Sequence, residues 1–217
     1  MESQHFSEND RVLYADGYEL AMESISTNSH PANLLSTIGE LYASMDKLLG
    51  WLQTFGNKHG VTIDCRKGCS FCCFQPVFAV THEFKYLNNH INKLFSKAEK
   101  ETILQKAIRK DRIVRDLPKE RMLGHRLPCP LLTDGKCSVY EARPMACRIY
   151  QSTNVSTCRN DYEHPENSEN YPALLHFPLR AGRMVDEGFV AGLKTLGIDS
   201  EEMRMEEGLI RHLSLES

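Results

Sequence analysis

The sequence has 217 residues, a formal net charge of −3, and a composition that is 41% hydrophobic and 25% charged. These proportions are typical of a globular protein with its own apolar core, and no apolar run is long enough to cross a bilayer. The small negative charge excludes a general attraction to nucleic acid or to anionic membranes, so we expect neither as a partner. The polar N-terminus, residues 1–16, lacks the basic start and apolar stretch of a secretory signal, which predicts a cytoplasmic protein.

The first 60 residues contain no cysteine and are predicted to be helical. Apolar side chains recur there at three- and four-residue spacing, which predicts one long amphipathic helix packed on the core. Pro31 suits its first turn, and Gly56 and Gly60 mark its end. The stripe consists of Leu34, Leu35, Ile38, Leu41, Tyr42, Met45, Leu48, Leu49 and Leu52.

Two helices are predicted after the first group of cysteines. The first runs from Thr81, as the capping residue, to about residue 94, and the second runs from 96 or 97 to about 115, before Pro118. Basic residues outnumber acidic ones in the stretch 93–126. We favour a solvated helix face over a binding patch as the interpretation of that excess.

Residues 124–178 are rich in proline, turn residues and cysteine and show little periodicity. Within this segment, Ser138-x-x-Glu141 has the pattern of a capping box, and Pro144 suits the first turn of a short helix that carries Cys147. A thiol near a helix N-terminus is favoured as the thiolate, which is the form that binds metals.

The C-terminal part regains helical periodicity. Apolar residues from Met184 to Leu196 predict a helix that ends at Gly197, and Asp199-x-x-Glu202 predicts the capped start of another helix running through residue 213. There is no internal repeat and no alternation of strands and helices. The sequence therefore predicts a mostly α fold.

Eight cysteines are the most informative feature of the sequence. Thiols stay reduced in the cytosol, where disulfide frameworks are rare, so metal or redox chemistry is the leading interpretation and disulfide pairing the alternative. Paired disulfides also leave the adjacent residues Cys72 and Cys73 unexplained. Among the histidines only His125, four residues before Cys129, has a spacing that resembles that of a ligand, and we expect ordinary polar roles for all of them.

The first cysteine group is Cys65-x3-Cys69-x2-Cys72-Cys73. On an ideal helix these thiols would share one stripe of roughly 100°, but the first and last would lie about 12 Å apart along the axis. That separation is too long for two ligands of one zinc ion, whose bonds to sulfur are about 2.3 Å. Since Gly68 permits a tight turn, we predict a loop that wraps a metal, or a helix bent there, completed by a later cysteine.

The later cysteines are Cys129, Cys137, Cys147 and Cys158. Eight thiolates exceed the four that one zinc ion or one iron–sulfur cluster uses. Two sites, one multinuclear site, or cysteines that bind no metal all remain open, and Cys158 is the weakest of the candidate ligands.

At this point the residues resemble a known family. The first cluster, then Cys129-Pro130-Leu131-Leu132, then the run GKCSVYEARPMACRIY at 135–150 resemble the YkgJ-like cysteine-cluster family of zinc- or iron-chelating domains. The resemblance covers roughly residues 60–160. It implies a metal-binding set made of Cys65, Cys69, Cys72, Cys73, Cys129, Cys137 and Cys147, with Cys158 as a weaker addition.

Two arginines flank Cys147. Arg143 and Arg148 are candidates for hydrogen-bonding to the thiolates around a cofactor or neutralising their charge. The equal alternative is that both are ordinary surface arginines. Tyr140 and Tyr150 are expected to pack over the site.

The spacing of the first three cysteines also matches that of radical S-adenosylmethionine enzymes. Those enzymes resemble full or partial α/β barrels, and the helical pattern after Pro76 offers no strands to build one. The adjacent Cys73 and the later Cys-Pro and Arg-Pro motifs fit the cysteine-cluster family better. A similar cluster also occurs in flagellin lysine methylases, where it is associated with an iron–sulfur centre, and only the cysteines carry this likeness.

The sequence therefore predicts a mostly α protein whose helices pack around a loop-rich, cysteine-ligated metal site. We predict three parts, namely an N-terminal helical extension (1–60), a cysteine-cluster metal-binding domain (61–160) and a C-terminal helical segment packed on it (161–217). The predicted cofactor is an iron–sulfur cluster, favoured over zinc because of the resemblance. The alternative function is a redox or protein-modification enzyme or an electron carrier. It is favoured by the number of thiolates, which exceeds the four that one structural zinc ion requires. The predicted partner is the metal ion or cluster, and a protein partner stays open.

Overall fold

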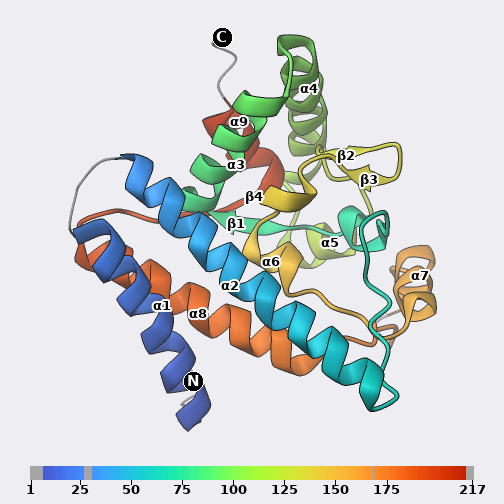
Figure 1. Cartoon of the computed structure of the whole chain (residues 1–217). Coiled ribbons are helices and arrows are strands. Elements are labelled where there is room, and N and C mark those ends of the chain that lie inside the picture. The colour runs from blue at the N-terminus through green and yellow to red at the C-terminus, as the bar shows by residue number, and fades with distance from the viewer. Residues whose placement is uncertain (1–6, 27–30, 168, 214–217) are drawn as a thin grey trace.

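The computed structural model describes residues 7–26, 31–167 and 169–213. Residues 1–6, the start of the polar N-terminus considered above, lie outside this range. Within it most of the chain is helical and strands are few (Figure 1), which confirms the mostly α prediction. None of the helices in these ranges is both long enough and apolar enough to cross a membrane.

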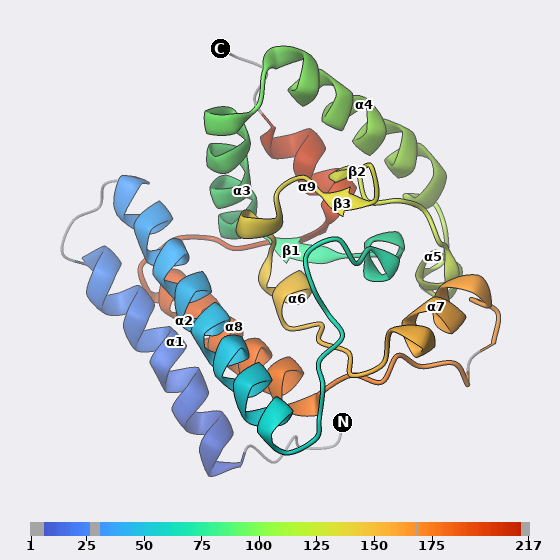
Figure 2. The ribbon, with the colours of Figure 1, turned by 45° about the vertical axis from the view of Figure 1, so that its right-hand side comes forward.

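Three long helices lie side by side and form one layer of the fold (Figures 1 and 2). They are α1 (Glu8–Ser26), α2 (Pro31–Lys58) and α8 (His176–Thr195). The α2 helix is the predicted amphipathic helix, and α8 ends just before Gly197 (φ 74°), as predicted. Together with α6 (Met145–Arg148) they enclose a first core of Ala21, Leu34, Ile38, Leu41, Tyr42, Met45, Leu49, Met145, Ile149, Val185, Phe189 and Leu193.

The helices α1 and α8 pack closely because glycine occupies the contact. A Cβ added at Gly188 would collide with the carbonyl oxygen of Tyr14, and one added at Gly17 would collide with that of Val185. Side chains of any size at these two positions would push the helices apart.

Substitution of Gly188 by alanine should therefore lower the free energy of unfolding by about 1–3 kcal/mol, the usual cost of overpacking. Gly50→Ala is the matched control, because Gly50 lies inside α2 and an added Cβ there meets no atom within 4 Å. That change should stabilise the protein by about 0.5–1 kcal/mol, since alanine favours helix. Urea denaturation of both variants measures the difference, and a stabilised Gly188→Ala variant would contradict the close helix contact.

A second group of helices packs on the other side of the molecule (Figure 2). It consists of α3 (Thr81–Leu94), α4 (Lys97–Val114) and α9 (Met205–His212). The first two have the predicted bounds to within a residue, and Ser96 caps α4 through a bond from the amide of Glu99. Their core contains Ala79, Phe84, Leu87, Ile91, Ile103, Ala107, Leu131, Val139, Ala142, Met203, Met205, Leu209 and Leu213.

The predicted capping role of Thr81 is wrong. Thr81 is the first residue of α3, and its hydroxyl accepts a hydrogen bond from the amide of Glu201 (3.0 Å). The helix start is held instead by Glu83, whose carboxylate accepts a bond from the amide of Val80 (3.0 Å). The Thr81 hydroxyl is thus engaged by a residue distant in sequence, and the local contact of Glu83 takes over the cap.

The segment before α9 is a strand, so the predicted helix start at Asp199-x-x-Glu202 is also wrong. Strand β4 (Glu202–Arg204) pairs antiparallel with β1 (Phe78–Val80), and Glu202 lies opposite Val80. Backbone pairing between distant segments overrides the capping pattern. The resulting two-stranded sheet lies between the two helical groups (Figure 2).

The cysteine-rich segment 124–178 folds into short elements, in agreement with its lack of periodicity. They are β2 (Leu132–Thr133), β3 (Lys136–Cys137), a 3₁₀ turn (Tyr140–Ala142), α6 and α7 (Val155–Glu163), and α5 (Lys119–Gly124) precedes them. Pro144 directly precedes α6, as predicted. The predicted capping box at Ser138 and Glu141 is wrong, because the hairpin brings the Ser138 hydroxyl within 2.9 Å of the carbonyl oxygen of Leu131, to which it donates.

The basic stretch 93–126 is only partly a solvated face. Arg109 is exposed on α4, but Lys110 is 8% exposed. The Lys110 ammonium lies 3.7 Å from the buried carboxylate of Glu206 and donates to the carbonyl oxygen of Leu127 (3.4 Å). Lys110 therefore belongs to the protein interior, as does Lys100, which is 5% exposed.

Candidate metal centre

A cavity of about 590 Å³ lies between the two cores, and seven of the eight cysteines line it. Met145 and Ile149 of the first core form part of its wall, and Leu131 and Met205 of the second core form another part. The lining cysteines are Cys65, Cys69, Cys72, Cys73, Cys129, Cys137 and Cys147. The set implied by the sequence resemblance is thus the set that shares one cavity, although metal binding by each residue stays a prediction.

The first cysteine group lies on a loop, not on a regular helix. Residues 65–70 are irregular, Gly68 has a φ of 100°, and Cys72 and Cys73 fall in a 3₁₀ turn (Phe71–Phe74). The predicted tight turn at Gly68 is therefore confirmed. The loop is anchored at Cys65, whose sulfur accepts a hydrogen bond from the amide of Ser152 (3.1 Å).

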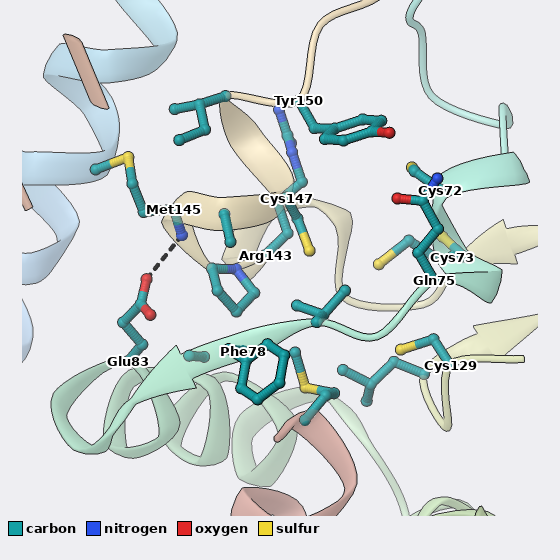
Figure 3. A pocket seen from close by; sticks show the side chains of 18 of the residues that line it. Cys72, Cys73, Gln75, Phe78, Glu83, Cys129, Arg143, Met145, Cys147 and Tyr150 are labelled. Atoms are coloured by element: carbon teal, nitrogen blue, oxygen red, sulfur yellow. Dashed lines mark hydrogen bonds between the residues drawn. The ribbon is translucent and has the colours of Figure 1, made fainter. Parts of the chain in front are cut away.

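The later cysteines reach the same cavity from a loop (Cys129), strand β3 (Cys137) and helix α6 (Cys147). The amide of Cys129 donates to the carbonyl oxygen of Cys73 (2.7 Å), which ties the two cysteine segments together. Cys137 ends strand β3 and pairs with Leu132. Cys147 projects from α6 toward the side of the pocket that carries Cys73 and Cys129 (Figure 3). Segments 60–80 and 124–160 are thereby joined around one space.

The thiols fall into two neighbourhoods that share Cys72. The negative charges of Cys72, Cys129 and Cys137 raise the pKa of both Cys73 and Cys147, and we call these five residues the inner group. The charge of Cys72 also acts on Cys65, together with the charges of Cys69 and Cys158. The inner group alone supplies more than four thiols.

The chemistry of the lining fits a soft metal. Thiolate sulfur selects zinc and iron–sulfur clusters, and no histidine in the described ranges lines the cavity. As placed in those ranges, no three His, Cys, Asp or Glu side chains converge on a point that could hold a metal ion. Coordination therefore requires the thiols to draw closer than they lie here. The residues present fit the group, and coordination by them is a proposal developed below.

Burial raises the pKa of several of these thiols. It raises the pKa of Cys65 and of Cys129 to about 11, and the pKa of Cys147 rises well above its usual value through burial and the neighbouring thiols. The expected thiolate preference of Cys147 is therefore wrong, because α6 is only four residues long and desolvation outweighs its dipole. The pKa of Cys72 is lowered, mainly by a hydrogen bond with Cys73.

The metal-free protein should lose stability in alkali. A thiol whose pKa is raised by folding releases its proton more easily when unfolded, so its stabilising contribution is present below about pH 9 and is lost as the pH rises toward 11. The urea midpoint of chelator-treated protein should accordingly fall between pH 8 and pH 10. Cys129→Ser should show a shallower fall, and an unchanged midpoint in the parent protein would contradict the burial of these thiols.

Arg143 lies where its predicted role requires. It lines the cavity, its guanidinium lies 4.0 Å from the centre of the Tyr140 ring, and its charge lowers the pKa of both Cys72 and Cys137. It also lies 3.7 Å from Asp46. Its action on a bound cofactor stays a prediction.

Arg148 does not line the cavity. Its side chain is 1% exposed, it donates to the carbonyl oxygens of Arg143 (2.8 Å) and Glu141, and it pairs with Asp46. The guanidinium also lies 4.1 Å from the centre of the Tyr42 ring. Its donors are therefore engaged by the protein itself.

Cys158 is the remaining cysteine. It is buried on α7 and lies outside the cavity lining. His125 also lies outside that lining, whereas Tyr140 and Tyr150 belong to it. The two tyrosines thus have the predicted place beside the site.

Four carboxylates of the same cavity escaped prediction. They are Glu83 on α3, Asp186 and Glu187 on α8, and Glu202 on β4. Glu83 is the third residue of the helix predicted from Thr81, and from the sequence alone it is interpreted as a helix-capping residue. No local pattern marks the other three, because the packing of distant elements brings them to the cavity.

The fold and the site define a mostly helical protein with one cavity lined by seven cysteines. Residues 64–171, about half of the chain, match the family named CxxCxxCC and described as a putative zinc- or iron-chelating domain. Through these residues the chain belongs to that family, which confirms the family suspected from the motifs. The family name writes two residues between the first two cysteines, and this chain has three. No curated protein and no solved structure matches the chain.

Proposed function

We propose that this protein binds an iron–sulfur cluster through thiolates of the inner cysteine group, with Cys65 and Cys69 on the adjoining loop. The observation that carries the proposal is the gathering of seven cysteines from separate segments around one cavity. Metal chelation is the function described for the family, and the choice of a cluster over a zinc ion is our inference.

The preference for a cluster over zinc rests on the resemblance of the cysteine motifs. Seven thiols line the cavity, more than the four that one zinc ion or one cluster uses, and all-thiolate ligation suits both. When bound, such a cluster supplies one-electron redox chemistry, and the chain's own part is to hold and shield it.

Arg143 has a defined part in this arrangement. Its positive charge lies close enough to lower the pKa of Cys72 and Cys137, so it stabilises thiolate over thiol. The buried cysteines without a nearby positive charge would release their protons to solvent when the metal binds.

The experiment is anaerobic purification followed by iron, zinc and sulfide analysis and an absorption spectrum. We expect a brown protein with iron and acid-labile sulfide, whose charge-transfer bands bleach with dithionite. Stoichiometric zinc in a colourless protein would overturn the cluster and retain chelation. The absence of both metals in stoichiometric amount would overturn chelation itself.

A redox or modification enzyme is the second candidate function. It is favoured by the extent of the cavity, which continues past the cysteines to the carboxylates of α3, α8 and β4. Reversible bleaching with dithionite and air would support a redox use of the cluster, and a cluster that neither bleaches nor recovers would argue for a structural role.

A further inference from the structure

One face of helix α4 is basic and exposed. Figures 1 and 2 show α4 at the edge of the molecule, and its buried side packs on α9. Arg109 and Arg112 are both exposed, and neither side chain makes a hydrogen bond or ion pair within the part of the chain that the structure describes. Asp111 does not offset their charge, because it pairs with Arg204 (2.8 Å). Two arginines of this face are therefore available to a partner.

A groove lies between α4 and the segment 127–132. Its volume is about 240 Å³, below the roughly 300–1,000 Å³ that is usual for small-molecule pockets. No acidic and no aromatic side chain of the described ranges lines it. Its size and its open, basic side suit the surface of a protein better than a separate small ligand. The lining residues are Lys106, Arg109, Lys110, Ile113, Leu127, Pro128, Cys129 and Leu132.

The two lysines of this groove differ in how far their charge is already used. Lys110 is buried, and the carboxylate of Glu206 lies 3.7 Å from its ammonium group. Lys106 is half-buried and donates to the carbonyl oxygen of Leu132 (3.0 Å), and an ammonium group has three donors. Lys106 has no carboxylate partner among the described residues. It thus adds a third positive charge to those of the two arginines.

The groove meets the proposed metal centre at Cys129. This residue lines both the groove and the cavity that holds the seven cysteines. Its amide donates to the carbonyl oxygen of Cys73 (2.7 Å), whereas the preceding residue, Pro128, is exposed. A protein seated in the groove would therefore touch a residue that we propose as a metal ligand. The groove joins the basic face to the centre through this one residue.

We infer that this groove docks a small acidic iron–sulfur electron carrier, which exchanges one electron with the proposed cluster by way of Cys129. The inference rests on the proposed function, since it requires a redox-active cluster behind Cys129. One iron centre is oxidised as the other is reduced, and no bond forms or breaks. Carboxylates of the carrier pair with the three cations, and Ile113, which is 51% exposed, supplies an apolar contact.

A nucleic acid fits this face less well. Three available cations are few beside the roughly six to ten phosphate contacts of a typical DNA-binding protein. The groove also lacks the aromatic side chains on which the bases of a single strand would stack. A carrier with a compact acidic patch needs only a few such pairs.

The test of docking is calorimetric titration of the cluster-loaded, full-length protein with a plant-type [2Fe–2S] ferredoxin as the acidic carrier. We expect binding in about 20 mM salt that weakens at least about tenfold in about 200 mM salt, because salt screens exposed charges. Replacing Arg109 and Arg112 together by glutamate should weaken binding at least about tenfold in the lower salt.

The matched control replaces Arg11 and Lys58 together by glutamate. These residues are exposed on α1 and α2, so the net charge changes equally but away from the groove. We expect affinity within about threefold of the parent, as for charges outside an interface. A urea curve and the iron content verify that both double variants fold and hold the cluster, and the salt dependence of the parent tests docking even if a variant fails to fold.

Electron exchange is followed by stopped-flow absorption. Oxidised protein is mixed with reduced ferredoxin, and reduced protein with oxidised ferredoxin, so one of the two mixtures is thermodynamically downhill. The inference is overturned by salt-independent or absent binding, by full affinity in the groove variant, or by exchange in neither mixture. Tighter binding of a single-stranded oligonucleotide than of ferredoxin would also overturn it. A parent protein without iron and sulfide would instead count against the proposed function, whatever it docks.

Discussion

Replacing Cys147 by serine should remove most of the bound metal, leaving less than about a tenth of the parent content. Cys147 belongs to the inner group, and its thiol is enclosed by α6 and the neighbouring cysteines. Serine preserves the shape of the side chain but is a far poorer ligand for a soft metal. The content is measured as iron, zinc and sulfide per chain after anaerobic purification.

Cys158→Ser is the matched control for this loss. Cys158 is a cysteine of the same chain, buried on α7, and it lies outside the cavity lining. We expect this variant to retain at least about four-fifths of its metal, since it leaves every lining thiol in place. If Cys158→Ser lost metal as completely as Cys147→Ser, the centre would have to be reassigned to the outer neighbourhood around Cys65 and Cys69.

Replacing Arg148 by methionine should lower the free energy of unfolding by about 3–5 kcal/mol. Arg148 is the largest of the fully buried side chains in the described residues. It donates to two backbone carbonyl oxygens, pairs with Asp46 and lies over the Tyr42 ring. Methionine fills part of the volume but leaves the carbonyl oxygens of Arg143 and Glu141 without this donor. A hydrogen bond from a charged donor contributes about 1.5–3 kcal/mol, so the loss of two accounts for a change of this size.

The comparison variant is Arg115→Met, whose side chain is 55% exposed and pairs with the exposed Asp116. Surface pairs contribute little, so its free energy of unfolding should change by less than about 1 kcal/mol. Urea denaturation of both variants, with the parent protein alongside, measures the difference. If Arg148→Met kept the parent stability but lost its metal, Arg148 would act on the cofactor and not on the fold.

Local patterns in the sequence predicted the long helices well. The apolar spacing of α2 and the capping pattern at Ser96 depend on neighbouring residues only, so they hold in the folded chain. The patterns at Ser138 and at Asp199 failed because a hairpin and a strand pairing, both made with other segments, took the same residues.

The site was predictable to a similar degree. The family motifs imply a metal-binding set of seven cysteines; all seven line one cavity, and their binding of metal stays a prediction. The hairpin that carries Cys137 had a readable signal, since its turn is Asp134-Gly135 with φ values of 49° and 72°, and an Asp-Gly pair is typical of tight hairpins. Asp186 had none, because only the folded chain brings it to the same cavity as Glu83 of α3 and Glu202 of β4.

The order of the elements along the chain has a consequence for how the centre is made. The wall formed by α8 includes Asp186 and Glu187, and this helix packs against α1 from the opposite end of the chain. During synthesis every lining cysteine, from residue 65 to residue 147, therefore leaves the ribosome before α8 does. The nascent chain passes through a stage in which all the thiols are present and the cavity is still open on one side. We expect the proposed metal to be delivered in that interval, before α8 packs against α1 and closes the protein around it.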